Sequence, residues 1–224
     1  TQGVSSAASD VYKRQSLVDA DVHNYVPSIE SLLPYLSRSW VEYIGHTGFK
    51  GPPALGGGGY PRFYESAARR DAWPPTGTMP GSDPDFMSQQ LLDEWNIDYA
   101  ILNPLYGIDG LHNLDFGNSL TQAVNDWTAN DWLDCDNRYK GSIAVNVNDP
   151  PAAATEIRRV AKDTRFVQIL LFVRGPAPYG RRQFRPIFEA AVDVNLPIGI
   201  HFGGGGNYPI TATGWPSFYI EDHT

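Results

Sequence analysis

The 224-residue sequence has one cysteine, Cys135, and no long apolar run. A single cysteine excludes an intrachain disulfide framework and every zinc motif built on several cysteines. The longest apolar stretch, residues 166–173, is interrupted by Gln168 and is far shorter than the roughly 20 residues that span a bilayer. Basic residues number 17 against 25 acidic ones, for a net charge of −8, which disfavours phosphate backbones and anionic lipids. We therefore expect a soluble, cytoplasmic protein that binds neither nucleic acid nor membranes.

Several common catalytic and nucleotide-binding motifs are also lacking. Neither glycine cluster completes the dinucleotide-binding pattern G-x-G-x-x-G, because Pro61 and Tyr208 fill the third positions. No lysine follows a glycine, as a Walker A loop requires, and the patterns G-x-S-x-G and H-E-x-x-H do not occur. These absences set aside the motif-defined nucleotide-binding, serine hydrolase and zincin classes.

The residues that are present favour a folded α/β domain. Hydrophobic residues make up 42% of the chain and aromatic residues 12%, enough for one sizeable core. Apolar periodicity of the helical kind separates short apolar segments, and this alternation predicts βαβ units and a parallel sheet. The predicted strands, apolar enough to be buried on both faces, are residues 16–23, 99–102, 142–145, 166–172 and 197–200. The predicted helical stripes are Met87, Leu91 and Trp95; Leu120, Val124 and Trp127; Ala153, Ile157, Val160 and Ala161; and Phe184, Ile187, Phe188, Ala191 and Val192.

Two segments fall outside this pattern. Residues 1–15 lack any period, and residues 10–15 resemble the translation of an adapter used to prepare sequencing libraries, so we interpret residues 1–15 as adapter-derived or disordered and residues 16–224 as one domain. A Gly/Pro-rich insertion occupies about residues 45–82. It is either a lid that brings Tyr60, Arg62 or Trp73 to a ligand, or a plain surface loop.

Polar side chains follow the predicted strands, at the edge where ligands bind in parallel sheets. Asp21 and His23 lie two residues apart, so strand geometry places both on one face. With His201, from the end of the last strand, they make a carboxylate and two imidazoles, a set that suits Zn²⁺, Mn²⁺ or Fe²⁺. A buried Asp–His hydrogen bond without a metal remains the alternative. The other polar residues at strand ends are Asn103, Asn146 and Arg174.

Four segments resemble the amidohydrolase-related family, which includes aminocarboxymuconate-semialdehyde decarboxylase and related metal-dependent hydrolases and carboxy-lyases. They are residues 19–23 (Asp-Ala-Asp-Val-His), 125–127 (Asn-Asp-Trp), 186–191 (Pro-Ile-Phe-Glu-Ala-Ala) and 196–201 (Leu-Pro-Ile-Gly-Ile-His). The resemblance implies an α/β fold of the TIM-barrel type, (β/α)₈, of which about the first five βα units are present. It also implies a divalent metal at the C-terminal face of the barrel.

The family's metal ligands map onto this sequence only in part. The His-x-His of its first strand corresponds to Asp21 and His23, and the histidine that ends its fifth strand corresponds to His201. The resemblance thus implies a divalent ion, with zinc expected and manganese or iron as alternatives. The family's histidine after the sixth strand and aspartate after the eighth have no counterpart, so we expect the acid/base beyond Thr224. His223 is interpreted as a helix residue rather than the missing histidine.

The resulting hypothesis is a metal-dependent hydrolase or carboxy-lyase (decarboxylase) that acts on a small organic acid or a related carbonyl compound, with the 224-residue chain itself inactive. Arg174 is a candidate anchor for a substrate carboxylate, or else a surface arginine paired with acids, and Asn103 is a second candidate substrate contact. The alternative function is a non-catalytic α/β domain that binds a small ligand without metal. Because five βα units leave sheet edges exposed, we also expect the chain alone to form homo-oligomers or aggregates.

Overall fold

The computed structural model describes residues 15–52 and 69–203. Within these ranges, no helix combines the length and the apolar character needed to cross a membrane. The interpretations of residues 1–14, of Tyr60 and Arg62, and of His223 concern positions outside the described residues.

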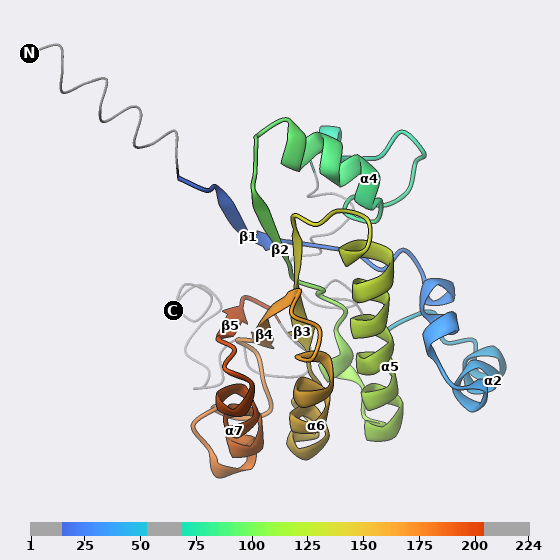
Figure 1. The fold of residues 1–224 in the computed structure, drawn as a ribbon. Coiled ribbons are helices and arrows are strands. Elements are labelled where there is room, and N and C mark those ends of the chain that lie inside the picture. Colours follow the sequence, from blue (N-terminus) through green and yellow to red (C-terminus); the bar gives the residue numbers. More distant parts are fainter. Residues whose placement is uncertain (1–14, 53–68, 204–224) are drawn as a thin grey trace, which may run out of the picture.

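Five parallel strands form one sheet in the order β1-β2-β3-β4-β5 (Figure 1). The predicted set of five parallel strands is confirmed, and each strand pairs with the next along the chain. Their bounds are β1 Val18–Val22, β2 Tyr99–Leu102, β3 Tyr139–Ala144, β4 Phe166–Phe172 and β5 Ile198–His201. The expected burial on both faces is wrong for the edge strands β1 and β5, where Val18 is 49% and Ile200 61% exposed.

Strand β3 begins at Tyr139, three residues earlier than the predicted segment 142–145. A tight turn sets this start: the Asp136 carboxylate accepts the backbone N–H of Arg138 at 2.9 Å and also bonds its guanidinium. The same Asp-x-Arg turn, made by Asp163 and Arg165, precedes β4. In both turns the hydrogen bonds from arginine lower the pKa of the aspartate. Period-2 patterning did not find the start of β3 because Lys140 and Gly141 interrupt its apolar run.

Three long helices follow β2, β3 and β4 and lie side by side on one face of the sheet (Figure 1): α5 Leu114–Trp127, α6 Pro150–Val160 and α7 Arg185–Val194. The α5 stripe predicted from the sequence is buried in the core. Asn113 and Asp149 cap α5 and α6, because their side chains accept backbone N–H groups of the first turn. The remaining elements are η1 Ile29–Tyr35, α2 Arg38–Thr47, η2 Arg70–Ala72, α4 Pro84–Met87, η3 Ser88–Asp93, η4 Ile108–Gly110, η5 Thr128–Leu133 and η6 Arg182–Phe184.

The sheet is strongly curved. Strands β1 and β5 are its two edges, and four spacings of about 4.8 Å would hold the edges of a flat sheet about 19 Å apart. Yet a carboxylate oxygen of Asp21 on β1 lies only 3.2 Å from Nε2 of His201 on β5. The five strands therefore curl into part of a barrel, with these two side chains inside the curve.

Two predicted apolar stripes are only partly buried. Trp95 is 60% exposed because it lies beyond the end of the helical segment at Asp93, in a turn that contains Asn96 with a positive φ of 52°. On α7, Ile187 and Ala191 are buried, but Val192 is 79% exposed. The periodicity therefore predicts the helix correctly, but the expected burial of Val192 is wrong.

Candidate metal site

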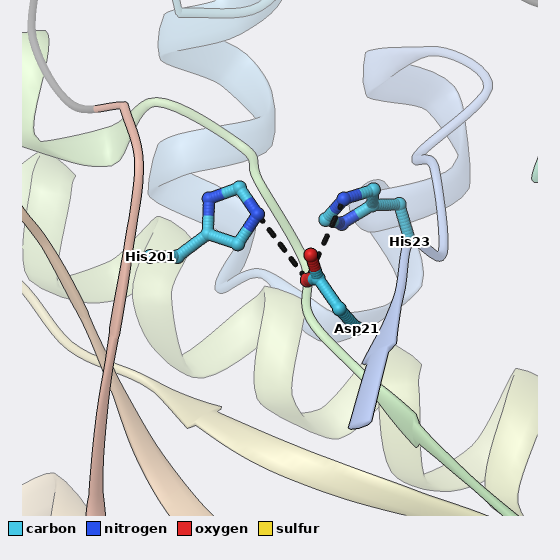
Figure 2. A group of neighbouring side chains, drawn as sticks. All are labelled: Asp21, His23 and His201. Atoms are coloured by element: carbon cyan, nitrogen blue, oxygen red, sulfur yellow. Dashed lines mark ion pairs between the residues drawn. The ribbon is translucent and has the colours of Figure 1, made fainter. Parts of the chain in front are cut away.

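Three side chains that could bind a metal ion meet at the C-terminal edge of the sheet (Figure 2). Asp21 lies on β1, His23 directly follows that strand, and His201 ends β5. One ligand atom from each lies within 4.8 Å of the other two. No other group of this kind occurs among the residues the structure describes. The structure therefore brings together the three residues proposed as ligands from the sequence.

The two imidazoles present the same nitrogen to Asp21. Nε2 of His23 lies 3.7 Å from Asp21 Oδ1, and Nε2 of His201 lies 3.2 Å from it. Their Nδ1 atoms instead contact backbone carbonyls, of Asn103 at 3.3 Å and of Phe202. A carbonyl oxygen only accepts hydrogen bonds, so a proton on Nδ1 would satisfy each of these contacts. In that tautomer the lone pair of the ring is on Nε2, which faces the carboxylate.

This arrangement suits a cation. Burial lowers the pKa of His23 below its usual value, and this effect outweighs the opposing hydrogen bond to the Asn103 carbonyl and the charge of Asp21. With its proton on Nδ1, a neutral His23 turns an imidazole lone pair toward a carboxylate oxygen. A divalent ion would satisfy both groups at once, and mixed nitrogen and oxygen ligands suit Zn²⁺, Mn²⁺ and Fe²⁺. Asp21 is 60% and His23 43% exposed, so water or substrate could reach such an ion.

Asn103 lies against the site, although its amide is engaged by protein groups. Nδ2 donates to Asp21 Oδ1 at 2.9 Å and to the Ala20 carbonyl at 3.2 Å. Oδ1 accepts from Ser142 and Gln168. The residue is buried, 3% exposed, and its role as a substrate contact stays a prediction.

Arg174 lies two residues after the end of β4, close to the site. Its backbone N–H bonds the carbonyl of Gly203, and its guanidinium carbon lies 5.7 Å from the centre of the Phe202 ring. Phe202 directly follows His201, so the arginine lies beside the segment that follows the third candidate ligand. Its Nε is buried and has no hydrogen-bond partner among the described residues. Arg174 thus retains a hydrogen-bond donor for a ligand. Asn146, the polar residue that follows β3, instead donates its amide to Asn118 on α5.

A cavity of about 160 Å³ adjoins His23, and sequence reasoning did not predict it. Its lining is mostly apolar and includes a Tyr106 hydroxyl that is buried without a hydrogen-bond partner among the described residues. Its residues come from the segments after β1 and β2 and from the Gly/Pro-rich insertion. Apolar residues directly after the strand ends are the feature of the sequence that could have predicted this cavity. The lining residues are His23, Asn24, Tyr25, Val26, Met79, Pro80, Leu105 and Tyr106.

Comparisons with solved structures find the same fold. A 5-carboxyvanillate decarboxylase from Novosphingobium aromaticivorans, crystallised with manganese and 4-hydroxy-3-methoxy-5-nitrobenzoic acid, is 23% identical with a TM-score of 0.62, over 86% of this chain and 52% of that one. The 2,6-dihydroxybenzoate decarboxylase from Rhizobium is 18% identical with a TM-score of 0.55, over 84% and 50%. The 5-carboxyvanillate decarboxylase from Sphingomonas paucimobilis is 19% identical with a TM-score of 0.56, over 83% and 51%.

The chain thus spans about half the length of these decarboxylases, and its five strands correspond to part of a (β/α)₈ barrel. No curated protein matches it at a significant level. The model of the amidohydrolase family matches residues 18–221, nearly the whole chain. The resemblance inferred from the sequence is confirmed, and the chain belongs to the amidohydrolase family.

Proposed function

We propose that Asp21, His23 and His201 bind one divalent metal ion in an enzyme that decarboxylates or hydrolyses a small organic acid. The observation that carries the proposal is the convergence of two imidazole Nε2 atoms on one oxygen of the Asp21 carboxylate. Zinc, manganese and iron all accept such ligands. Manganese is the first ion to test, because the decarboxylase from Novosphingobium aromaticivorans was crystallised with it.

The residues around the three ligands have separate roles in this proposal. When bound, the metal ion would supply Lewis acidity, polarising a substrate oxygen and lowering the pKa of water. Arg174 holds the substrate carboxylate with its guanidinium, and the buried Nε is one donor for that contact. The cavity beside His23 takes the apolar part of the acid, where Tyr106 offers a hydroxyl. This lining suits a planar aromatic acid that carries polar substituents.

Binding is a better test of this chain than turnover. The acid/base implied by the family resemblance has no counterpart in the sequence, so we expect the chain to bind metal and acid without releasing carbon dioxide. The probe is 4-hydroxy-3-methoxy-5-nitrobenzoic acid, whose nitrophenol absorbance reports binding in a titration. We expect binding with Mn²⁺ and its loss with EDTA. Equal affinity in both conditions would contradict the metal-dependent function and support the metal-free ligand-binding alternative.

Replacement of Arg174 tests the carboxylate anchor. A charge-assisted hydrogen bond contributes about 1.5–3 kcal/mol, so we expect Arg174→Ala to raise the Kd of the Mn²⁺-loaded chain for the nitro acid about 10- to 100-fold. Arg174→Lys keeps the charge and is expected to lose less. Arg158→Ala is the matched control, since Arg158 pairs with Asp193 away from the site. Equal Kd values for Arg174→Ala and the unmodified chain would rule out this role for Arg174.

A further inference from the structure

Three polar side chains form a connected network inside the curved sheet. Ser142 on β3 donates its hydroxyl to Asn103 Oδ1 at 2.6 Å. Gln168 on β4 donates Nε2 to Asn103 Oδ1 at 3.1 Å and to Ser142 Oγ at 2.8 Å. Asn103, which directly follows β2, connects these residues to Asp21, because its Nδ2 donates a hydrogen bond to the Asp21 carboxylate. Side chains from three neighbouring strands therefore connect to a single carboxylate.

The network fixes which way the Asn103 amide points. Its Nδ2 faces the Ala20 carbonyl and the Asp21 carboxylate, and both groups can only accept hydrogen bonds. Its Oδ1 faces two donors, the Ser142 hydroxyl and the Gln168 amide nitrogen. A flipped amide would place its oxygen against two acceptors and its nitrogen against a second amide nitrogen. The orientation that directs an N–H at Asp21 is therefore the one that satisfies every partner.

Ser142 and Asn103 are buried and Gln168 is partly buried, in a region that barrels of this kind usually fill with branched apolar side chains. Buried polar groups cost stability unless each is hydrogen-bonded, so an apolar filling would serve the core equally well. Strand β5 also leaves room for the network: a Cβ on Gly199 would lie 3.1 Å from Gln168 Oε1. Because this network is hydrogen-bonded to the candidate ligand Asp21, it can orient that carboxylate, which apolar side chains could not do.

Asn103 also contacts a second candidate ligand. Its backbone carbonyl faces Nδ1 of His23 at 3.3 Å, and a proton on Nδ1 bonded to it would leave Nε2 with its lone pair for an ion. The side chain of the same residue holds Asp21 Oδ1 at 2.9 Å, leaving a further lone pair of that oxygen for an ion. One residue thereby orients two of the three groups that would bind the metal.

On this basis we infer that Asn103, held by Ser142 and Gln168, is a positioning residue that sets the metal affinity of the site by orienting Asp21 and His23. The inference rests on the proposed function, because it requires the three ligands to bind a metal. It assigns Asn103 a role through the ligands and not through contact with substrate.

The test measures Mn²⁺ affinity, with the EPR signal of free Mn²⁺ as the readout. Loss of a hydrogen-bond partner of a metal ligand typically costs about 10- to 100-fold in metal affinity, and we expect this for Asn103→Ala. For Ser142→Ala, which removes one bond to the Asn103 amide, we expect about two- to tenfold; this variant also serves if Asn103→Ala fails to fold. The matched control is Asn125→Ala: Asn125 is equally buried, but its amide bonds the backbone of Ala144. We expect it to lower stability and leave Mn²⁺ affinity unchanged.

A double-mutant cycle shows whether Asn103 acts through Asp21. In an Asp21→Ala background, Asn103→Ala is expected to change the remaining Mn²⁺ affinity less than about twofold, because interacting residues are not additive. An equal loss in both backgrounds would overturn the inference, as would a folded Asn103→Ala chain with unchanged affinity. If the unmodified, folded chain binds no Mn²⁺, the proposed metal site itself is wrong and the inference fails with it.

Discussion

His201→Ala is expected to weaken Mn²⁺ binding by more than about 100-fold. Loss of a residue that only hydrogen-bonds a metal ligand already lowers metal affinity about 10- to 100-fold, and loss of a ligand itself should lower it further. His201 supplies one of the two Nε2 atoms that face Asp21, and alanine leaves two ligands on β1 and its following residue. Equilibrium dialysis followed by metal analysis measures the affinity. The same experiment with Zn²⁺ compares the two ions.

The control for this variant is His46→Ala. His46 is exposed in the last turn of α2 and belongs to no ligand group of the described residues, so its replacement is expected to leave Mn²⁺ affinity unchanged. If His201→Ala keeps the affinity of the unmodified chain, the metal is bound elsewhere. In that case the contact between Asp21 and the histidines is an ordinary hydrogen-bonded cluster.

Gly81→Ala is expected to lower both the Mn²⁺ affinity and the stability of the chain, although Gly81 is not one of the three candidate ligands. Gly81 has a φ of +77°, and a Cβ on it would lie 2.6 Å from the backbone carbonyl oxygen of His23. Its own carbonyl accepts the N–H of Tyr25 at 2.7 Å, which ties the insertion to the segment after β1. Alanine here must push the His23 backbone away, so we expect Mn²⁺ affinity to fall about tenfold or more and stability to fall by about 2–4 kcal/mol, from strain and crowding together.

Gly77→Ala separates these two effects. Gly77 has nearly the same φ, +78°, but a Cβ there would meet nothing within 4 Å. It should cost only the strain of the left-handed conformation, about 1–2 kcal/mol, and leave Mn²⁺ affinity unchanged. Urea unfolding without metal and Mn²⁺ titration report the two quantities. Equal losses of affinity in both variants would mean that contact with His23 is not the cause.

The sequence predicted the parts of this protein that depend on local pattern. Strand ends in a parallel sheet lie on one edge, so Asp21, His23 and His201 were expected at the same edge, and the barrel implied by the family resemblance brings the ends of β1 and β5 toward each other. The buried stripe of α5, for example Leu120 and Val124, follows from helical periodicity alone. Local repeats, of 2 residues for Asp21 and His23 and of 3.6 residues for α5, determine which of these side chains share a face.

Features that depend on contacts between distant strands were not predictable in the same way. Ser142 and Gln168 look like interruptions of apolar strands, and only the curvature of the sheet shows that both point at Asn103. The role of Gly81 depends on a backbone approach to His23 across 58 positions of the chain, which no periodicity encodes. The identity of the metal is equally hidden, since one carboxylate and two imidazoles suit several ions.

Anomalous diffraction at the manganese edge, from crystals of the chain grown with Mn²⁺, tests the metal site most directly. We predict one strong peak in direct contact with the Asp21 carboxylate and with Nε2 of both His23 and His201. A map with no peak among these three groups at saturating Mn²⁺, or with manganese bound only elsewhere, would contradict the proposed site.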